Sequence, residues 1–138
     1  MSTKDVSQPI RPERSRIDLV LTQYVIALSV VMMLFGLRQW AVILGIMPGQ
    51  TGDFETMTTP WAVVTVHMAV VDVIVAVGLW NQAAWGKVLW VYAALFEVAI
   101  HTAFIGTFGT QWPVVAFHVV TLVVFGLLTL LSRRQIRR

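Results

Sequence analysis

Four long apolar runs limit what this chain can fold into more than any other feature of its sequence. They cover residues 19–40, 60–80, 85–106 and 112–131, and each approaches the roughly 20 residues that a helix needs to span about 30 Å of hydrocarbon. The runs are uniformly apolar rather than alternating, which favours helices over membrane-barrel strands. The sequence therefore predicts an all-α membrane protein, an antiparallel bundle of four transmembrane helices joined by short loops.

Proline and tryptophan support these limits. Thr58-Thr59-Pro60 is typical of a helix cap followed by proline in the first turn, which is where the second run begins. One tryptophan, Trp90, lies inside a run. The others lie at predicted helix ends, where the indole ring stays apolar while its N–H group stays wet: Trp40, Trp61, Trp80, Trp85 and Trp112.

Charged residues are few and unevenly placed. They make up 12% of the chain against 57% hydrophobic residues, a balance that a soluble core of this size could not bury. Nine of the ten Lys and Arg residues lie in the terminal segments or by the loop 81–87, with Arg38 as the exception. The positive-inside rule then places both termini in the cytoplasm. We expect a multi-pass protein of the bacterial cytoplasmic (inner) membrane, whose cations meet the lipid bilayer rather than nucleic acid.

The expected organisation has three parts. Residues 1–17 form a cytoplasmic N-terminal tail, residues 18–132 the transmembrane domain, and residues 133–138 a basic cytoplasmic C-terminal tail. The absence of cysteine excludes thiolate catalysis, disulfides and thiolate metal ligands. No nucleophile–base set or phosphate-binding glycine loop indicates an enzyme.

Ionisable side chains inside apolar runs are costly, so they mark candidate sites. The principal candidates are Asp72 in the second run, Glu97 and His101 in the third, and His118 in the fourth. At about 1.5 Å of rise per residue, the last three lie about 6 to 12 Å below the predicted outer boundary, and Asp72 lies about 18 Å below it. Helical spacing allows all four to point into the bundle.

Two further residues, His67 and Arg38, are secondary candidates. His67 lies about 140° around its helix from Asp72, so we expect it to face a different neighbour, another subunit or lipid. Arg38 lies near the outer end of the first run. It either snorkels to the headgroups or acts as a counter-charge for Glu97, for Asp72 or for the acidic outer loop.

Several roles for the four principal candidates stay open. They can hydrogen-bond to one another and hold the helices in register. They can form a path for protons or a small solute, with histidine as the mobile member. As cofactor ligands, His101 and His118 suit the two axial positions of haem b, and with Glu97 and Asp72 they suit a divalent metal such as iron or zinc. The third cofactor alternative is a quinone, which would accept a hydrogen bond from His101 while Trp90 and Phe104 line its ring.

Short motifs resemble the DoxX-like group of small bacterial four-helix membrane proteins. The first run contains Phe35-Gly36-Leu37-Arg38, and the second ends Val77-Gly78-Leu79-Trp80. The third is entered through Ala83-Ala84-Trp85-Gly86-Lys87, and is similar in this to uncharacterised four-helix inner-membrane proteins of alphaproteobacteria. The resemblance implies the same architecture. Because DoxX is linked to quinone-dependent sulfur oxidation, it also implies a redox association.

The leading functional interpretation is an accessory or assembly subunit of a larger membrane complex, with a membrane-protein partner or further copies of itself. Small and polar residues form one stripe on the second run, as is typical of helix–helix contacts: Ala62, Thr65, Ala69, Asp72 and Ala76. The alternatives are a redox-associated subunit that binds haem b, a metal ion or quinone, and a proton or small-solute path.

Overall fold

The computed structural model describes residues 16–136, and every regular element within that range is helical. The α-helices are α1 (Arg16–Ile43), α2 (Thr59–Trp80), α3 (Ala84–Thr102), α4 (Ile105–Phe108) and α5 (Trp112–Ile136). One 3-10 turn, η1 (Phe54–Thr56), lies between α1 and α2. The expected all-α class is confirmed.

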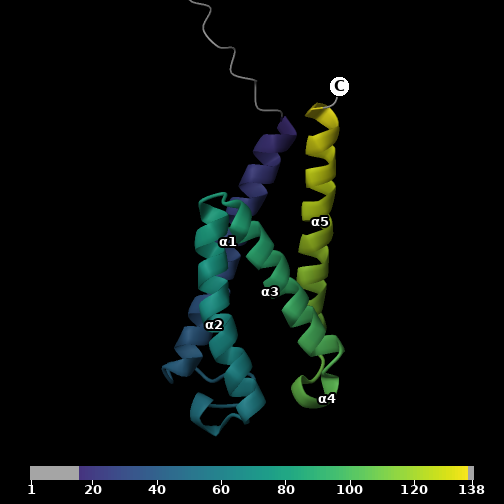
Figure 1. The fold of residues 1–138 in the computed structure, drawn as a ribbon. Coiled ribbons are helices and arrows are strands. Elements are labelled where there is room, and N and C mark those ends of the chain that lie inside the picture. The colour runs from purple at the N-terminus through teal and green to yellow at the C-terminus, as the bar shows by residue number, and fades with distance from the viewer. Residues whose placement is uncertain (1–15, 137–138) are drawn as a thin grey trace, which may run out of the picture.

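Figure 1 shows the arrangement of the helices. α1 and α2 lie side by side, and α3 runs obliquely from the α2–α3 turn to the first half of α5. The start of α1 and the end of α5 lie toward one end of the molecule. The 44–58 loop and α4 lie toward the other, which we call the loop end.

Three helices, α1, α2 and α5, are long and apolar enough to cross a membrane. α3 is not among them. It has 19 residues and carries Lys87, Glu97 and His101, and charged groups lower the tendency of a helix to enter lipid. Three of the four expected spans are therefore long and apolar enough for a crossing.

Some helix boundaries differ from those expected. The helix expected over 85–106 ends at Thr102, because Phe104 leaves the helical region of backbone angles (φ −111°, ψ 35°) and the separate turn α4 follows. α5 continues to Ile136, so part of the expected tail 133–138 is helical. The expected tail 1–17 lies outside the described residues except for its last two positions.

Glycines allow the closest contacts between helices. A Cβ atom built on Gly86 of α3 would lie 2.3 Å from the backbone of Gly78 on α2. A Cβ atom on Gly36 of α1 would lie 2.8 Å from the side chain of Val73 on α2. Small residues let helix backbones approach closely, and contacts of this kind join α1, α2 and α3.

Burial agrees with most of the sequence pattern. Four members of the predicted α2 stripe are buried: Thr65, Ala69, Asp72 and Ala76. Trp90 is fully buried, as its place inside a run predicts, whereas Trp80 and Trp112 at helix ends are exposed. α5 contributes little to the core, since Val115 and His118 are the buried residues among those described on it.

The 44–58 loop forms a cap at the loop end of α1 and α2. The Ile46 N–H group donates to the carbonyl of Ala41 at the end of α1. The Thr65 hydroxyl on α2 donates to the sulfur of Met57 at 3.8 Å. A Cβ atom on Gly49 would lie 2.1 Å from the Met57 methyl group, so glycine lets the loop close over this side chain. The cap is thereby attached to both helices.

We predict that Gly86→Ala lowers the stability of the protein by about 1 to 3 kcal/mol, because the added methyl group forces α3 away from the backbone of α2. The measurement is unfolding in detergent, followed by tryptophan fluorescence. Gly126→Ala on α5 is the matched control, since nothing lies within 4 Å of its Cβ position. Equal stabilities of the two variants would contradict the tight α2–α3 contact.

Candidate functional site

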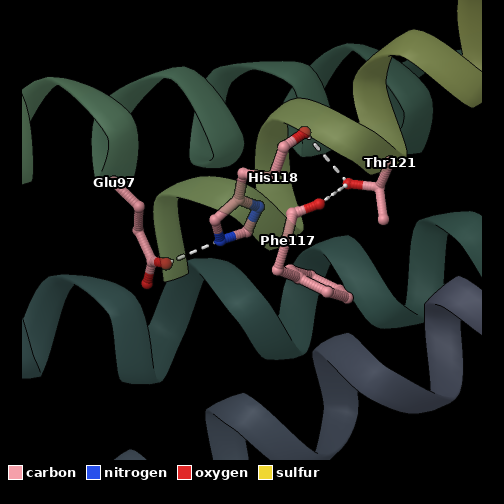
Figure 2. Close-up of polar contacts among 4 residues, drawn as sticks. All are labelled: Glu97, Phe117, His118 and Thr121. Atoms are coloured by element: carbon pink, nitrogen blue, oxygen red, sulfur yellow. Dashed lines mark hydrogen bonds and ion pairs between the residues drawn. The ribbon is translucent and has the colours of Figure 1, made fainter. Parts of the chain in front are cut away.

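The centre of the site is a contact between α3 and α5. His118 Nε2 lies 2.6 Å from Glu97 Oε2 (Figure 2), with the His118 side chain fully buried and the Glu97 side chain 12% exposed. A bond of this length needs a donor on one atom and a lone pair on the other, so the two groups share a proton. The sequence predicted both residues, and the structure brings them together.

The turn of α5 that carries His118 is fixed by its neighbours. The Thr121 hydroxyl lies within hydrogen-bonding distance of the carbonyls of Phe117 and His118, at 2.9 and 3.1 Å (Figure 2). The Thr121 carbonyl accepts a 2.7 Å hydrogen bond from the Tyr24 hydroxyl on α1. Three helices therefore determine where the imidazole lies.

A cavity of about 200 Å³ opens beside Glu97 at the loop end. Its wall is built from α1, α2, α3, the first turn of α5 and the 44–58 loop. Glu97 and His101 contribute to it, and so does Arg38. The remaining lining residues are Phe35, Gln39, Gly49, Gln50, Met57, Trp61, Val64, Thr65, Met68, Ile100 and Val114. Glu97 thus lies between this cavity and the buried His118.

Asp72 lies on α2, fully buried, and neither of its carboxyl oxygens has a hydrogen-bond partner. Gly36 allows α1 to pack against it, since a Cβ atom there would lie 3.2 Å from the Asp72 Cβ atom. The Glu97 carboxyl is near enough to act on Asp72 as a like charge. An unpartnered buried carboxyl is costly, so Asp72 is the one principal candidate whose cost the described contacts do not offset.

His101 is buried but does not contact the Glu97–His118 pair through a hydrogen bond. Its Nδ1 atom lies 3.3 Å from the carbonyl oxygen of Gly109, and its ring packs 6.3 Å from that of Trp61. It therefore holds the α3–α5 connection against the end of α3. This contact explains part of its burial without a ligand.

The secondary candidates have other surroundings. His67, expected to face a different neighbour, another subunit or lipid, lies 3.1 Å from the Tyr92 hydroxyl on the exposed side of α3, and its ring packs against Phe96. The helix that His67 contacts is therefore α3, which crosses α2 obliquely. Arg38 is exposed, and among the described residues it forms no ion pair with Glu97 or Asp72.

The arrangement limits which cofactors fit. Within residues 16–136 no three His, Asp or Glu side chains come together as a metal site would require. The cavity of about 200 Å³ lies below the 300 Å³ or more that pockets for drug-sized ligands occupy, and a haem is larger still. Trp90, expected beside a quinone, lies in the core and not in the cavity wall.

Sequence reasoning missed several parts of the cavity. Gln39 and Gln50 supply carboxamides, and Trp61 supplies an aromatic wall. Trp61 was interpreted only as a boundary residue. The signal that could have marked Gln50 is its place in a short loop between two apolar runs, which must close over the helix ends that it joins.

We predict that Glu97 and His118 are energetically coupled. In a double-mutant cycle with Glu97→Leu and His118→Leu, the coupling free energy should be about 1 kcal/mol, within the range of up to about 1.7 kcal/mol for polar contacts between membrane helices. The measurement is unfolding in detergent. The exposed His67–Tyr92 contact is the control, with His67→Leu and Tyr92→Phe, and should couple more weakly. Equal coupling in the two cycles would refute a special role for the buried pair.

Comparison with known proteins gives a family but no activity. No curated protein and no solved structure matches the chain. The DoxX-like resemblance is not tested by these comparisons and stays a prediction. One family model matches residues 19–136, which is most of the chain. The chain therefore belongs to a family of unknown function, DUF6163.

Proposed function

We propose that this chain is a bacterial inner-membrane protein with four antiparallel crossings, which takes up and releases a proton in the outer half of the membrane. α3 is the crossing that needs an argument. At about 1.5 Å per residue, its 19 residues reach about 28 Å, close to the hydrocarbon thickness. Its polar groups are also masked inside the bundle, because Glu97 contacts His118 and His101 contacts Gly109.

The orientation follows from the distribution of cations. Arg133 and Arg134 lie at the end of α5, and Lys87 lies near the α2–α3 turn, on the side opposite the loop end. The positive-inside rule supports a cytoplasmic position for both termini. The loop end, with its cap and the cavity, then faces the outside.

The observation that carries the proposal is the double contact of Glu97. Its carboxyl group lines the outward-facing cavity and also bonds to the fully buried His118. A proton that enters the cavity can therefore reach a buried imidazole through one side chain. Imidazole is the side chain best suited to exchange protons near neutral pH.

Charged and titratable groups face Glu97 from each neighbouring helix. His118 approaches from α5, and Asp72 acts on it from α2 as a like charge. Arg38 of α1 lies in the wall of the same cavity, as does His101, one turn further along α3. Among these groups, His118 is the one that bonds to the Glu97 carboxyl.

The half of the bundle away from the loop end supports proton uptake at the site rather than proton conduction across the membrane. Among the described residues, the ionisable side chains at the α1–α5 contact away from the loop end are Tyr24 and Asp18, and each is engaged with α5. Tyr24 donates to the Thr121 carbonyl, and Asp18 accepts a hydrogen bond from Ser132. We therefore propose a site that exchanges protons with the outer side only.

Infrared difference spectroscopy during pH jumps on the purified protein in detergent tests this function. Wild-type protein should show a carboxyl C=O band that is lost in Glu97→Gln and shifted in frequency in His118→Gln, because the hydrogen-bond partner changes. His67→Gln should leave that band in place. Identical difference spectra for wild type and Glu97→Gln would overturn the proposal.

A second candidate function, the accessory subunit, is favoured by Gly126 on α5. Gly36, Gly78 and Gly86 are each used in a close helix contact, whereas nothing in the described chain lies within 4 Å of the Gly126 Cβ position. Glycine inside a helix costs about 0.5 to 1 kcal/mol relative to alanine. Small residues let a neighbouring membrane helix approach closely, so we infer that a helix of another membrane protein packs here.

Cysteine crosslinking in native membranes tests the accessory role, since the chain has no cysteine of its own. Leu130→Cys, one turn from Gly126 and 57% exposed, should give one discrete crosslinked species, identified by mass spectrometry. Gly126→Leu should abolish it. Leu34→Cys on α1, 60% exposed, is the control and should give none. A crosslinked species of twice the chain mass would show that the partner is a second copy of this chain and not another protein. Equal crosslinking from Leu130→Cys and Leu34→Cys would refute the α5 contact.

A further inference from the structure

The cavity at the loop end holds opposite charges that do not neutralise each other. Arg38 contributes to one part of its wall and Glu97 to another, yet among the described residues the two form no ion pair. Glu97 Oε2 is bonded to His118, and no hydrogen bond joins Oε1 to any residue that the structure describes. Proton exchange through Glu97 needs neither Arg38 nor an enclosed volume, so the proposed function does not account for this arrangement.

The rest of the cavity wall is suited to a small organic body. Phe35, Val64 and Ile100 give it an apolar surface, and Trp61 gives it an aromatic one. Its volume of about 200 Å³ somewhat exceeds that of a cavity of about 150 Å³ that holds benzene. A molecule with fewer than about ten non-hydrogen atoms fits a space of this size.

The 44–58 loop contributes three residues to this wall. Met57 and Gly49 both line the cavity, and they pack against each other so closely that no side chain fits at Gly49. Gln50, the next residue, adds a carboxamide that can donate and accept hydrogen bonds. A wall with one cation, one anion and carboxamides is the arrangement expected for a ligand that itself carries both charges.

We infer that the cavity binds a small aliphatic zwitterion of amino-acid size. The anionic group of the ligand pairs with the Arg38 guanidinium, whose planar fork matches a carboxylate. The cationic group faces Glu97 Oε1, and the short apolar body lies against Phe35 and Trp61. This inference goes beyond proton uptake, because it assigns Arg38 a role that proton uptake does not use.

Binding is tested by titrating the purified full-length protein in detergent and following the fluorescence of its tryptophans, with calorimetry as a second readout. The probes are glycine, L-valine and glycine betaine, compared with isobutylamine, which lacks the anionic group, and isobutyrate, which lacks the cationic group. At least one zwitterion should bind saturably, and at least tenfold more tightly than either singly charged probe. No saturable binding of any zwitterion, or equal binding of isobutylamine, would overturn the inference.

Arg38→Gln should weaken binding of the zwitterion at least tenfold, whereas Lys87→Gln, the control on the opposite end of α3, should leave it unchanged. Arg38→Gln should also keep the Glu97 carboxyl band of the infrared experiment, which shows that the variant is folded and that the proton function is intact. If wild-type protein shows no Glu97 carboxyl band in the infrared experiment but still binds a zwitterion, the proton function alone is refuted. Equal affinities of Arg38→Gln and Lys87→Gln would refute the ligand site.

Discussion

The hydrogen bond between Glu97 and His118 is the contact on which the position of α5 depends. α5 buries only Val115 and His118 among its described residues, and lipid covers the rest of its surface as readily as protein does. A polar contact that lipid cannot replace is therefore what selects one place for this helix. Tyr24 and Asp18 add polar links from α1 to α5. The close glycine contacts join α1, α2 and α3, together with a 2.9 Å hydrogen bond from the Trp40 indole on α1 to the Ala69 carbonyl on α2.

The same bond also determines what the site can do. The hydrogen bond to His118 stabilises the Glu97 carboxyl group through one of its oxygens, and Glu97 also lines the cavity. In the proposed function, Glu97 is thus both the structural contact and the group that exchanges a proton. Substitutions of Glu97 are therefore expected to affect stability and chemistry together, whereas Arg38 lines the cavity and forms no ion pair with Glu97 among the described residues.

The sequence predicted the helices and the buried faces because both follow from local pattern. Apolar length defined the spans, and helical spacing placed Asp72 and His118 in the interior. The sequence pattern did not predict which histidine bonds to Glu97. His101, one turn away on the same helix, was as good a candidate as His118, and only the crossing of α3 over α5 decides between them.

The features that the sequence did not predict depend on chain geometry outside the helices. The end of α3 at Thr102 follows from the backbone angles of Phe104, a residue that is apolar and equally compatible with a longer helix. The cap over the cavity depends on Met57 packing against Gly49, a contact between residues that no periodic pattern relates. The contact between His67 and Tyr92 arises because α3 crosses α2 obliquely, and residue spacing on a single helix does not predict a crossing angle.

The contact between Gly78 and Gly86 has a consequence for how the protein is made. In the proposed four-crossing arrangement, α3 must enter the bilayer although it carries Glu97 and Lys87 and is not among the helices that qualify as membrane spans by length and composition. A charged residue near the centre of an isolated segment opposes insertion by the translocon by about 2.5 to 3.5 kcal/mol. Two glycines at the base of a three-residue turn allow α2 and α3 to fold onto each other as a hairpin before α5 is synthesised. α2 can then carry its weaker partner into the membrane, and α5 completes the pair with His118 once it follows.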